Sequence, residues 1–236
     1  MRVSGALRFG AFVACGLGLG LAACDPATMQ AMSAGGGSPS RAKVTVAGRP
    51  VVIAAPPGFC VDAPSTTLTS AGAFVLMSDC ALLGQKAGRG APVGAALTAS
   101  VSSGGLGGEG DDEASTLDDL QDFLDTADGR AMLGRSGRGD RVRVLSKQLR
   151  GDVLYVLVED RGPQPVAGID RRFWRAFMDV KGRMAVLSVV GFQGGGPDPQ
   201  EGLNYLASFA TAIQAANPAP GRPRVTTARP AAGSDA

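Results

Sequence analysis

Long apolar stretches joined by short turns characterise the second half of this chain. Two of them, residues 153–158 and 184–190, are apolar at almost every position rather than at alternate ones. A strand of that kind must be covered on both of its faces. The pattern predicts four consecutive strands, at residues 141–149, 153–159, 169–180 and 184–192. Their connections are short and contain Gly or Pro, so we expect antiparallel pairing.

The first half of the chain predicts further strands. Residues 43–46 and 51–55 flank a Gly- and Pro-containing turn and are typical of a hairpin. Two more strands are expected at residues 73–77 and 94–102.

Two amphipathic helices are also predicted. Ser115 begins a sequence with the form of a capping box, apolar residues follow it at helical spacing, and Gly129 is expected to end this helix. Asp198 is expected to cap the second helix, with Pro199 at its first position. The apolar stripe of the second helix is formed by Leu203, Leu206, Phe209, Ala210 and Ile213.

These elements predict the fold class α+β, with an antiparallel sheet covered by helices on both faces. The order of strands and helices, with the turn Pro56-Pro57-Gly58 and an aromatic residue after the first hairpin, resembles the Mog1/PsbP-like fold. That family includes exported and lipid-anchored bacterial proteins and photosystem accessory proteins. The resemblance covers about residues 43–216 and implies a helix–sheet–helix sandwich.

The N-terminal residues predict an export signal. Arg2 and Arg8 precede a short apolar run that ends at small residues, as in a secretory signal peptide. The sequence Leu21-Ala22-Ala23-Cys24 resembles a bacterial lipobox, which implies cleavage before Cys24 and attachment of a diacylglycerol to its thiol. The alternatives are an ordinary signal peptide and an uncleaved helix that contains a cysteine. Asp25 resembles the signal that retains lipoproteins in the inner membrane of enteric bacteria.

The chain therefore divides into four segments. Residues 1–23 are expected to be the lipoprotein signal peptide, and residues 24–42, rich in Gly, Ser and Ala, are expected to form a flexible tether. Residues 43–216 form a single domain. Residues 217–236 are rich in Pro, Arg and Ala without apolar periodicity, which is typical of a disordered tail.

The cysteines support export. The chain has 4 cysteines, of which Cys15 leaves with the signal peptide and Cys24 is the lipid site. In an oxidising envelope the remaining pair, Cys60 and Cys80, is expected to form a disulfide. A pair of metal ligands and a reactive thiol are the alternatives. The chain has no C-x-x-C motif and no histidine, so neither is favoured.

The charge pattern argues against nucleic acid as a partner. The formal net charge of +2 equals the contribution of the two leader arginines, so the mature protein is close to neutral. Locally, every charged residue in 109–128 is acidic, and every charged residue in 130–150 except Asp140 is basic. Such blocks are typical of solvated faces.

No motif indicates catalysis, a cofactor or a metal. A chain without histidine has no Ser-His or Cys-His pair. Residues 105–110 match G-x-G-x-x-G, but the acidic residues beside them would repel a pyrophosphate, so we expect a loop without a cofactor. The same acidic loop lacks the spacing of a dedicated calcium site. We therefore predict that the chain is not an enzyme.

One cluster of residues is a candidate for binding a partner. Arg171, Arg172, Trp174 and Arg175 combine cations with a large aromatic ring, a composition typical of binding hot spots. The structural alternative places Phe173 and Trp174 on opposite covered faces of a strand that the arginines begin. The function expected is that of a lipid-anchored envelope protein with a binding or assembly role and an envelope protein as partner. A small-ligand module with a pocket between helix and sheet is the alternative, and a histidine-free hydrolase is the third.

Overall fold

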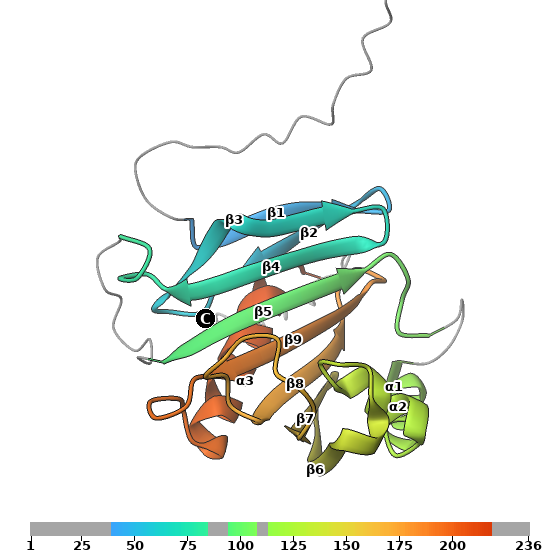
Figure 1. The fold of residues 1–236 in the computed structure, drawn as a ribbon. Coiled ribbons are helices and arrows are strands. Elements are labelled where there is room, and N and C mark those ends of the chain that lie inside the picture. Colours follow the sequence, from blue (N-terminus) through green and yellow to red (C-terminus); the bar gives the residue numbers. More distant parts are fainter. Residues whose placement is uncertain (1–38, 85–93, 108–112, 219–236) are drawn as a thin grey trace, which may run out of the picture. The chain divides into compact units, whose positions relative to one another are not determined.

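The computed structural model describes residues 39–84, 94–107 and 113–218 (Figure 1). In chain order, the elements are β1 (Arg41–Val46), β2 (Arg49–Ala54), β3 (Phe59–Thr69), β4 (Gly72–Asp79), β5 (Ala95–Ser102), α1 (Glu113–Phe123), α2 (Ala127–Leu133), a short 3₁₀ helix (Gly139–Arg141), β6 (Val142–Arg150), β7 (Val153–Asp160), β8 (Arg172–Asp179), β9 (Met184–Gly191) and α3 (Pro199–Ala216).

Seven strands form one sheet in the order β3-β4-β5-β9-β8-β7-β6, and β1 and β2 form a separate two-stranded sheet. Every neighbouring pair is antiparallel, which confirms the prediction made from the short connections. The strand expected at residues 169–180 is shorter than predicted, because Ile169 makes only an isolated bridge to Phe192 and regular pairing begins at Arg172.

The edge strand β3 is missing from the sequence-based prediction. Its second half is polar and contains Pro64, so the apolar alternation is lost. The register with β4 shifts between Asp62 and Thr67, where the Ser65 hydroxyl donates to Asp62 Oδ2 at 2.7 Å. A proline is tolerated here because an edge strand has a neighbour on one side only.

The predicted pairing of Cys60 with Cys80 is present in the structure. Cys60 lies near the start of β3 and Cys80 directly follows β4, with their Cα atoms 4.8 Å apart. The bond closes the end of the β3–β4 hairpin, where the Cys80 N–H also donates to Gly58 O at 3.1 Å.

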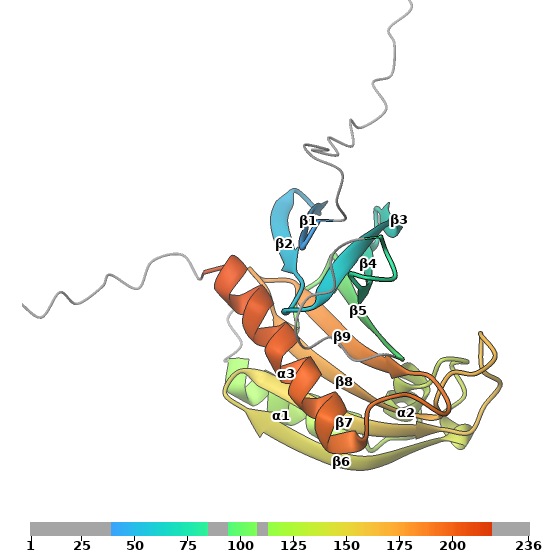
Figure 2. The same ribbon diagram turned by 90° about the vertical axis from the view of Figure 1, so that its left-hand side faces the viewer.

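Alternate residues of the central strands enter two different apolar clusters. On β8, Trp174 and Met178 belong to the first cluster, and Phe173 and Phe177 belong to the second. The first cluster also contains the buried stripe of α3, which lies across β7, β8 and β9 (Figure 2). The second contains Leu117 and Leu124 of the α1 region and Leu133 of α2. This division explains why β7 is apolar at successive positions.

The prediction of one helix that Gly129 ends is wrong. The backbone is helical from Glu113, before Ser115, and α1 ends at Phe123. A second helix, α2, then begins at Ala127, capped by the Thr126 hydroxyl, which accepts from Gly129 N at 3.0 Å. Gly129 lies inside α2, and this position requires a glycine because a Cβ atom there would be 2.0 Å from Phe123 O. This glycine therefore permits a close approach between the two helices.

The C-terminal helix α3 agrees with the sequence. The Asp198 side chain accepts from Glu201 N at 2.8 Å, and Pro199 occupies the first helical position. All five residues of the predicted apolar stripe are buried.

The folded part extends slightly beyond its predicted limits of residues 43 and 216. β1 begins at Arg41, inside the predicted tether. Asn217, which the sequence pattern places in the tail, is only 8% exposed. Its side-chain amide donates to Val52 O at 2.6 Å and accepts from Val52 N at 2.9 Å. Residues 1–38 and 219–236, with Cys24 among them, lie outside the described residues. Within the described ranges, no helix is long and apolar enough to cross a membrane.

Candidate functional site

A cavity of about 420 Å³ lies where the end of β7, the start of β8 and the end of β9 meet the N-terminus of α3; we call it the α3 cavity. Leu157, Trp174 and Val189 line it, and these three residues are partners in register across β7, β8 and β9. They give the cavity an apolar wall built on the rigid sheet.

Trp174 is fixed in this wall by its polar edge. The residue is 4% exposed, and its indole N–H donates to Pro199 O at 2.6 Å. Gly202 of α3 lets the helix approach the ring, because a Cβ atom there would lie 3.3 Å from Trp174 Cδ1. The buried ring thus joins β8 to the first turn of α3 and faces the cavity only in part.

Arg171 and Arg172 also line the cavity, and both are exposed. The Arg172 guanidinium, 63% exposed, lies 3.6 Å from Glu159 Oε1, and the two residues are partners in register on β8 and β7. Glu159 is only 12% exposed and binds Arg161 more closely, at 2.8 Å. Arg171 donates from Nη1 to Arg161 O at 3.1 Å.

Asp170 supplies a carboxylate to the same cavity. Its backbone is held from both sides, since its N–H donates to Gly191 O at 2.9 Å and its carbonyl accepts from Arg135 Nη1 at 2.9 Å. Oδ2 of the side chain occupies space that a Cβ atom at Gly191 or Gly196 would fill, at 2.7 Å in each case. No sequence pattern singles out Asp170, because its place in the cavity depends on the loop after β9.

Arg175 is separated from the other residues of the predicted patch. It does not line the α3 cavity but packs near Phe173, with its Cζ 5.5 Å from the ring centroid. The Cζ atom of Arg135 lies 4.1 Å from the same centroid. Its Nη1 donates to Met132 O at 3.1 Å, and its buried Nε has no hydrogen-bond partner among the described residues. Burial and, second, repulsion from Arg135 lower the pKa of Arg175 to about 10, so it stays charged at neutral pH.

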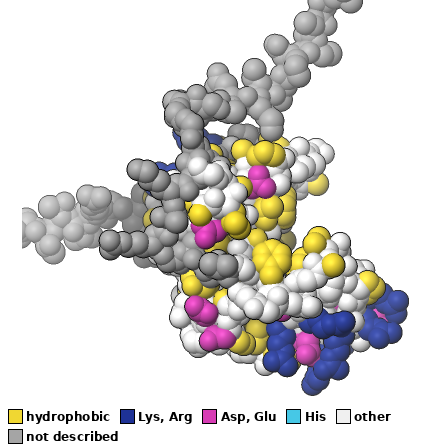
Figure 3. Space-filling model, turned by 60° about the vertical axis from the view of Figure 1, so that its left-hand side comes forward, with side chains coloured by type: hydrophobic (Ala, Val, Ile, Leu, Met, Phe, Trp, Pro, Cys, Tyr) yellow, Lys and Arg dark blue, Asp and Glu magenta, His cyan; other side chains and the backbone are white. Residues whose placement is uncertain are grey.

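Beside the cavity, five exposed arginines form a connected group, which we call the arginine cluster. Figure 3 shows basic side chains gathered in one region with acidic ones among them. The cluster consists of Arg138, Arg141, Arg161, Arg171 and Arg172.

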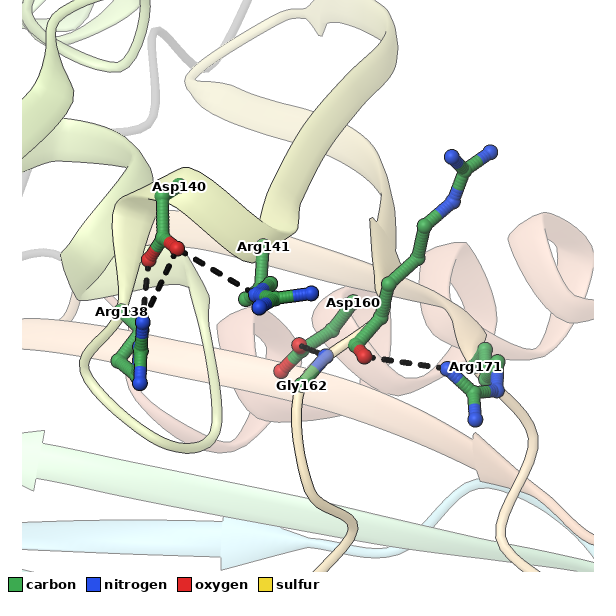
Figure 4. A network of polar contacts seen from close by, with 7 residues as sticks. Arg138, Asp140, Arg141, Asp160, Gly162 and Arg171 are labelled. Carbon is green, nitrogen blue, oxygen red and sulfur yellow. Dashed lines mark hydrogen bonds and ion pairs between the residues drawn. The ribbon is translucent and has the colours of Figure 1, made fainter.

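The contacts within the cluster run from one arginine to the next. Arg138 and Arg141 both bind the Asp140 carboxylate, at 3.1 and 3.3 Å (Figure 4). The Arg161 N–H donates to Arg141 O at 2.9 Å, which joins this pair to Arg161 and through it to Arg171. Only Asp140 and Glu159 form ion pairs with the five guanidinium groups within the described ranges, so the cluster retains an excess of positive charge.

A buried carboxylate holds the backbone beneath the cluster. Asp160 is 0% exposed; its Oδ2 accepts from Arg135 N at 2.8 Å and its Oδ1 accepts from Gly162 N at 2.7 Å (Figure 4 shows the second contact). The Asp160 N–H donates to Arg171 O at 2.9 Å. This residue therefore ties the end of β7 to the segment after α2 and to the start of β8.

The structure thus brings Arg171, Arg172 and Trp174 to one cavity and leaves Arg175 elsewhere, with Phe173 and Trp174 in different apolar clusters. Among the described residues, no group of three or more acidic or cysteine side chains could hold a metal ion. The glycine motif at residues 105–110 runs partly through residues 108–110, outside the described ranges. In comparisons with known proteins, no family model, no curated protein and no solved structure matches this chain.

Proposed function

We propose that this chain is a lipid-anchored protein of the bacterial cell envelope whose folded domain binds an acidic protein partner and catalyses no reaction. The observation that carries this proposal is the arginine cluster, in which four exposed guanidinium groups share the carboxylates of Asp140 and Glu159 and a fifth, that of Arg171, donates to Arg161 O. Guanidinium groups bind carboxylates through two parallel hydrogen bonds, so a surface of this kind suits an acidic partner. The lack of histidine throughout the sequence supports the non-enzymatic part.

The anchor in this proposal is a diacylglycerol on Cys24, on the periplasmic side of the membrane. It is supported by the lipobox-like sequence before Cys24 and by the leader arginines. A second acyl chain on the processed N-terminus would give the double signal that stable anchoring requires. Asp25 favours the inner membrane over the outer membrane.

The fold we propose is a Mog1/PsbP-like sandwich with helices on both faces of the sheet. Two features support it. The stripe of α3 shares one apolar cluster with Trp174 and Met178, whereas apolar residues of α1 and α2 share the other with Phe173 and Phe177. Consecutive residues of a strand point to opposite faces, which is the arrangement that such a sandwich requires.

A second candidate function is that of a small-ligand module. The α3 cavity favours it, since its volume of about 420 Å³ lies within the range of small-molecule sites, roughly 300–1,000 Å³. Its position between the sheet and the N-terminus of α3 is the one that this alternative requires.

The lipid anchor is tested by replacing its acceptor. We expect the wild-type protein to incorporate a fatty-acid probe in vivo and to fractionate with membranes, and Cys24→Ser to lose the label. Cys15→Ser is the matched control, because Cys15 lies in the segment that the signal peptidase removes. An unlabelled wild-type protein in the soluble fraction would refute the anchor.

The partner surface is tested by removing charge from the arginine cluster. Arg138→Gln with Arg141→Gln leaves the α3 cavity intact, since neither residue lines it. We expect mild cross-linking in membranes to give a discrete adduct with the wild-type protein. The double variant should give several-fold less adduct, and added salt should weaken the wild-type adduct in the same way.

The control removes the same number of charges elsewhere. Arg41 and Arg150 are exposed and lie outside the arginine cluster, in β1 and at the last position of β6. Their double replacement by glutamine should leave the adduct unchanged. An adduct that both double variants reduce equally, or that neither reduces, would contradict the assignment of the surface.

A further inference from the structure

The α3 cavity combines an apolar wall with charges of both signs. Leu157, Trp174 and Val189 form the wall, and two positions further along the same face of the sheet lie Glu159 and Arg172. Asp170 lines the cavity from the segment before β8. A ligand in this cavity therefore meets an apolar surface, a guanidinium group and a carboxylate at once.

The charged groups in the cavity are only partly satisfied by the protein. Within residues 39–84, 94–107 and 113–218, no hydrogen bond reaches the Asp170 carboxylate and none leaves the Arg172 guanidinium. In these ranges the single ion-pair contact of Arg172, to Glu159 Oε1, spans 3.6 Å, whereas Arg161 binds Oε2 of the same carboxylate at 2.8 Å. Both groups are thus available to a ligand.

These groups exclude ligands that carry a single charge. A small anion that approaches Arg172 would also meet the carboxylates of Asp170 and Asp198, and a small cation at Asp170 would meet Arg171 and Arg172. Like charges in a partly desolvated cavity oppose binding. A ligand with one charge of each sign satisfies both groups.

We propose that the α3 cavity binds an apolar zwitterion, either a free α-amino acid or a short peptide. Its ammonium group binds the Asp170 carboxylate, its carboxylate binds Arg172 with Arg171 beside it, and its apolar side chain lies against Trp174. The glycines at 191 and 196 leave room for the Asp170 carboxylate, because a Cβ atom at either position would lie 2.7 Å from Oδ2. This inference goes beyond the binding of an acidic protein by the arginine cluster, with which the cavity shares Arg171 and Arg172.

The test uses the only tryptophan of the chain, Trp174, as its reporter. Purified full-length protein in detergent is titrated with leucine, leucyl-leucine, N-acetyl-leucine and leucinamide, and tryptophan emission is followed. We expect a saturable change with at least one of the two zwitterions. N-acetyl-leucine, which lacks the ammonium group, and leucinamide, which lacks the carboxylate, should bind at least tenfold more weakly.

The two zwitterions identify the source of the ligand. Tighter binding of leucine assigns the cavity to amino acids, and tighter binding of leucyl-leucine assigns it to peptides. No saturable change with either zwitterion would overturn the proposal. Equal binding of either singly charged analogue would do the same.

Variants then locate the binding to the cavity. We expect Asp170→Asn and, separately, Arg172→Gln to weaken zwitterion binding at least tenfold, whereas Asp119→Asn, at an exposed carboxylate of α1, should leave it unchanged. Because Asp170→Asn could disturb its loop, the exposed Arg172 gives the independent variant. Wild-type affinity in both variants would overturn the assignment.

The same titration separates this inference from the proposed partner surface. The Arg138→Gln, Arg141→Gln protein should bind the zwitterion as the wild type does, even where its cross-linked adduct is lost. Loss of zwitterion binding in that variant would contradict the separation of the two sites.

Discussion

Replacement of the Asp160 side chain, which carries a buried carboxylate, by the methyl group of alanine should strongly destabilise the domain. Asp160→Ala leaves the backbone N–H groups of Arg135 and Gly162 without the oxygens that accept from them at 2.8 and 2.7 Å. It also removes the negative charge that favours the charged form of Arg135 and Arg175. The variant therefore combines lost hydrogen bonds with uncompensated positive charge.

The size of the effect follows from these two losses. Each hydrogen bond to a charged group contributes about 1.5–3 kcal/mol, and breaking a buried charge interaction costs about 3–5 kcal/mol. We take about 3–5 kcal/mol for the whole, since the two losses share the same carboxylate. For a domain of this size, 1 kcal/mol lowers Tm by about 2–4 °C, which gives a decrease of about 6–20 °C.

Thermal unfolding followed by circular dichroism measures this decrease. Asp140→Ala is the matched control, because Asp140 is 57% exposed and binds two arginines that are themselves more than half exposed. It should leave Tm unchanged. A decrease below about 3 °C for Asp160→Ala, or an equal decrease in the control, would refute the role given to Asp160.

Two further predictions concern the fold. Gly129→Ala should destabilise the domain by about 1–3 kcal/mol in chemical denaturation, because its Cβ would meet Phe123 O at 2.0 Å. Gly104→Ala, where a Cβ meets no atom within 4 Å, should be neutral, and equal effects of the two would contradict the close approach. The Cys60–Cys80 disulfide leaves neither residue with a free thiol. Thiol titration of denatured, unreduced protein that carries Cys15→Ser and Cys24→Ser should therefore find none. Reduction should then lower the stability by about 3 kcal/mol, and two free thiols before reduction would refute the bridge.

The strands that the sequence predicts well are those with an unbroken apolar pattern. β7 and β9 are buried on successive positions, and their short turns allow only antiparallel neighbours. β3 escapes prediction because Pro64 and the shift between Asp62 and Thr67 interrupt its alternation. The irregular pairing is tolerated because β3 lies at the edge of the sheet, a position that the sequence does not reveal.

The helices show how a single glycine misleads a local rule. Gly129 follows an apolar helical pattern and so looks like a helix end, yet it allows α2 to approach the end of α1. Thr126 was the available signal, since a threonine three residues before the glycine can cap a new helix. At α3 the local signals hold, and Asp198 and Pro199 act as expected.

The candidate site was only partly accessible from the sequence because neighbours along a strand point to opposite faces. Residues 171–175 form one apparent cluster in the sequence, but Trp174 faces the α3 cavity while Arg175 lies beside Phe173. The partners that complete the site come from other segments. Glu159 lies opposite Arg172 only because of the β7–β8 register, and Asp170 depends on the backbone of Gly191 and Gly196.

Asp160 supports both candidate surfaces, and this determines which variants can test them. Its N–H binds Arg171 O within the arginine cluster, and its Oδ2 binds the backbone of Arg135, whose guanidinium donates to Asp170 O at the cavity. Loss of Asp160 should therefore weaken partner capture and zwitterion binding together, through displaced backbone rather than through lost contacts. The double replacement of Arg138 and Arg141, and the replacement of Asp170, change side chains of one site only and do not remove that support. These variants can therefore separate the two functions, whereas Arg172 belongs to both sites.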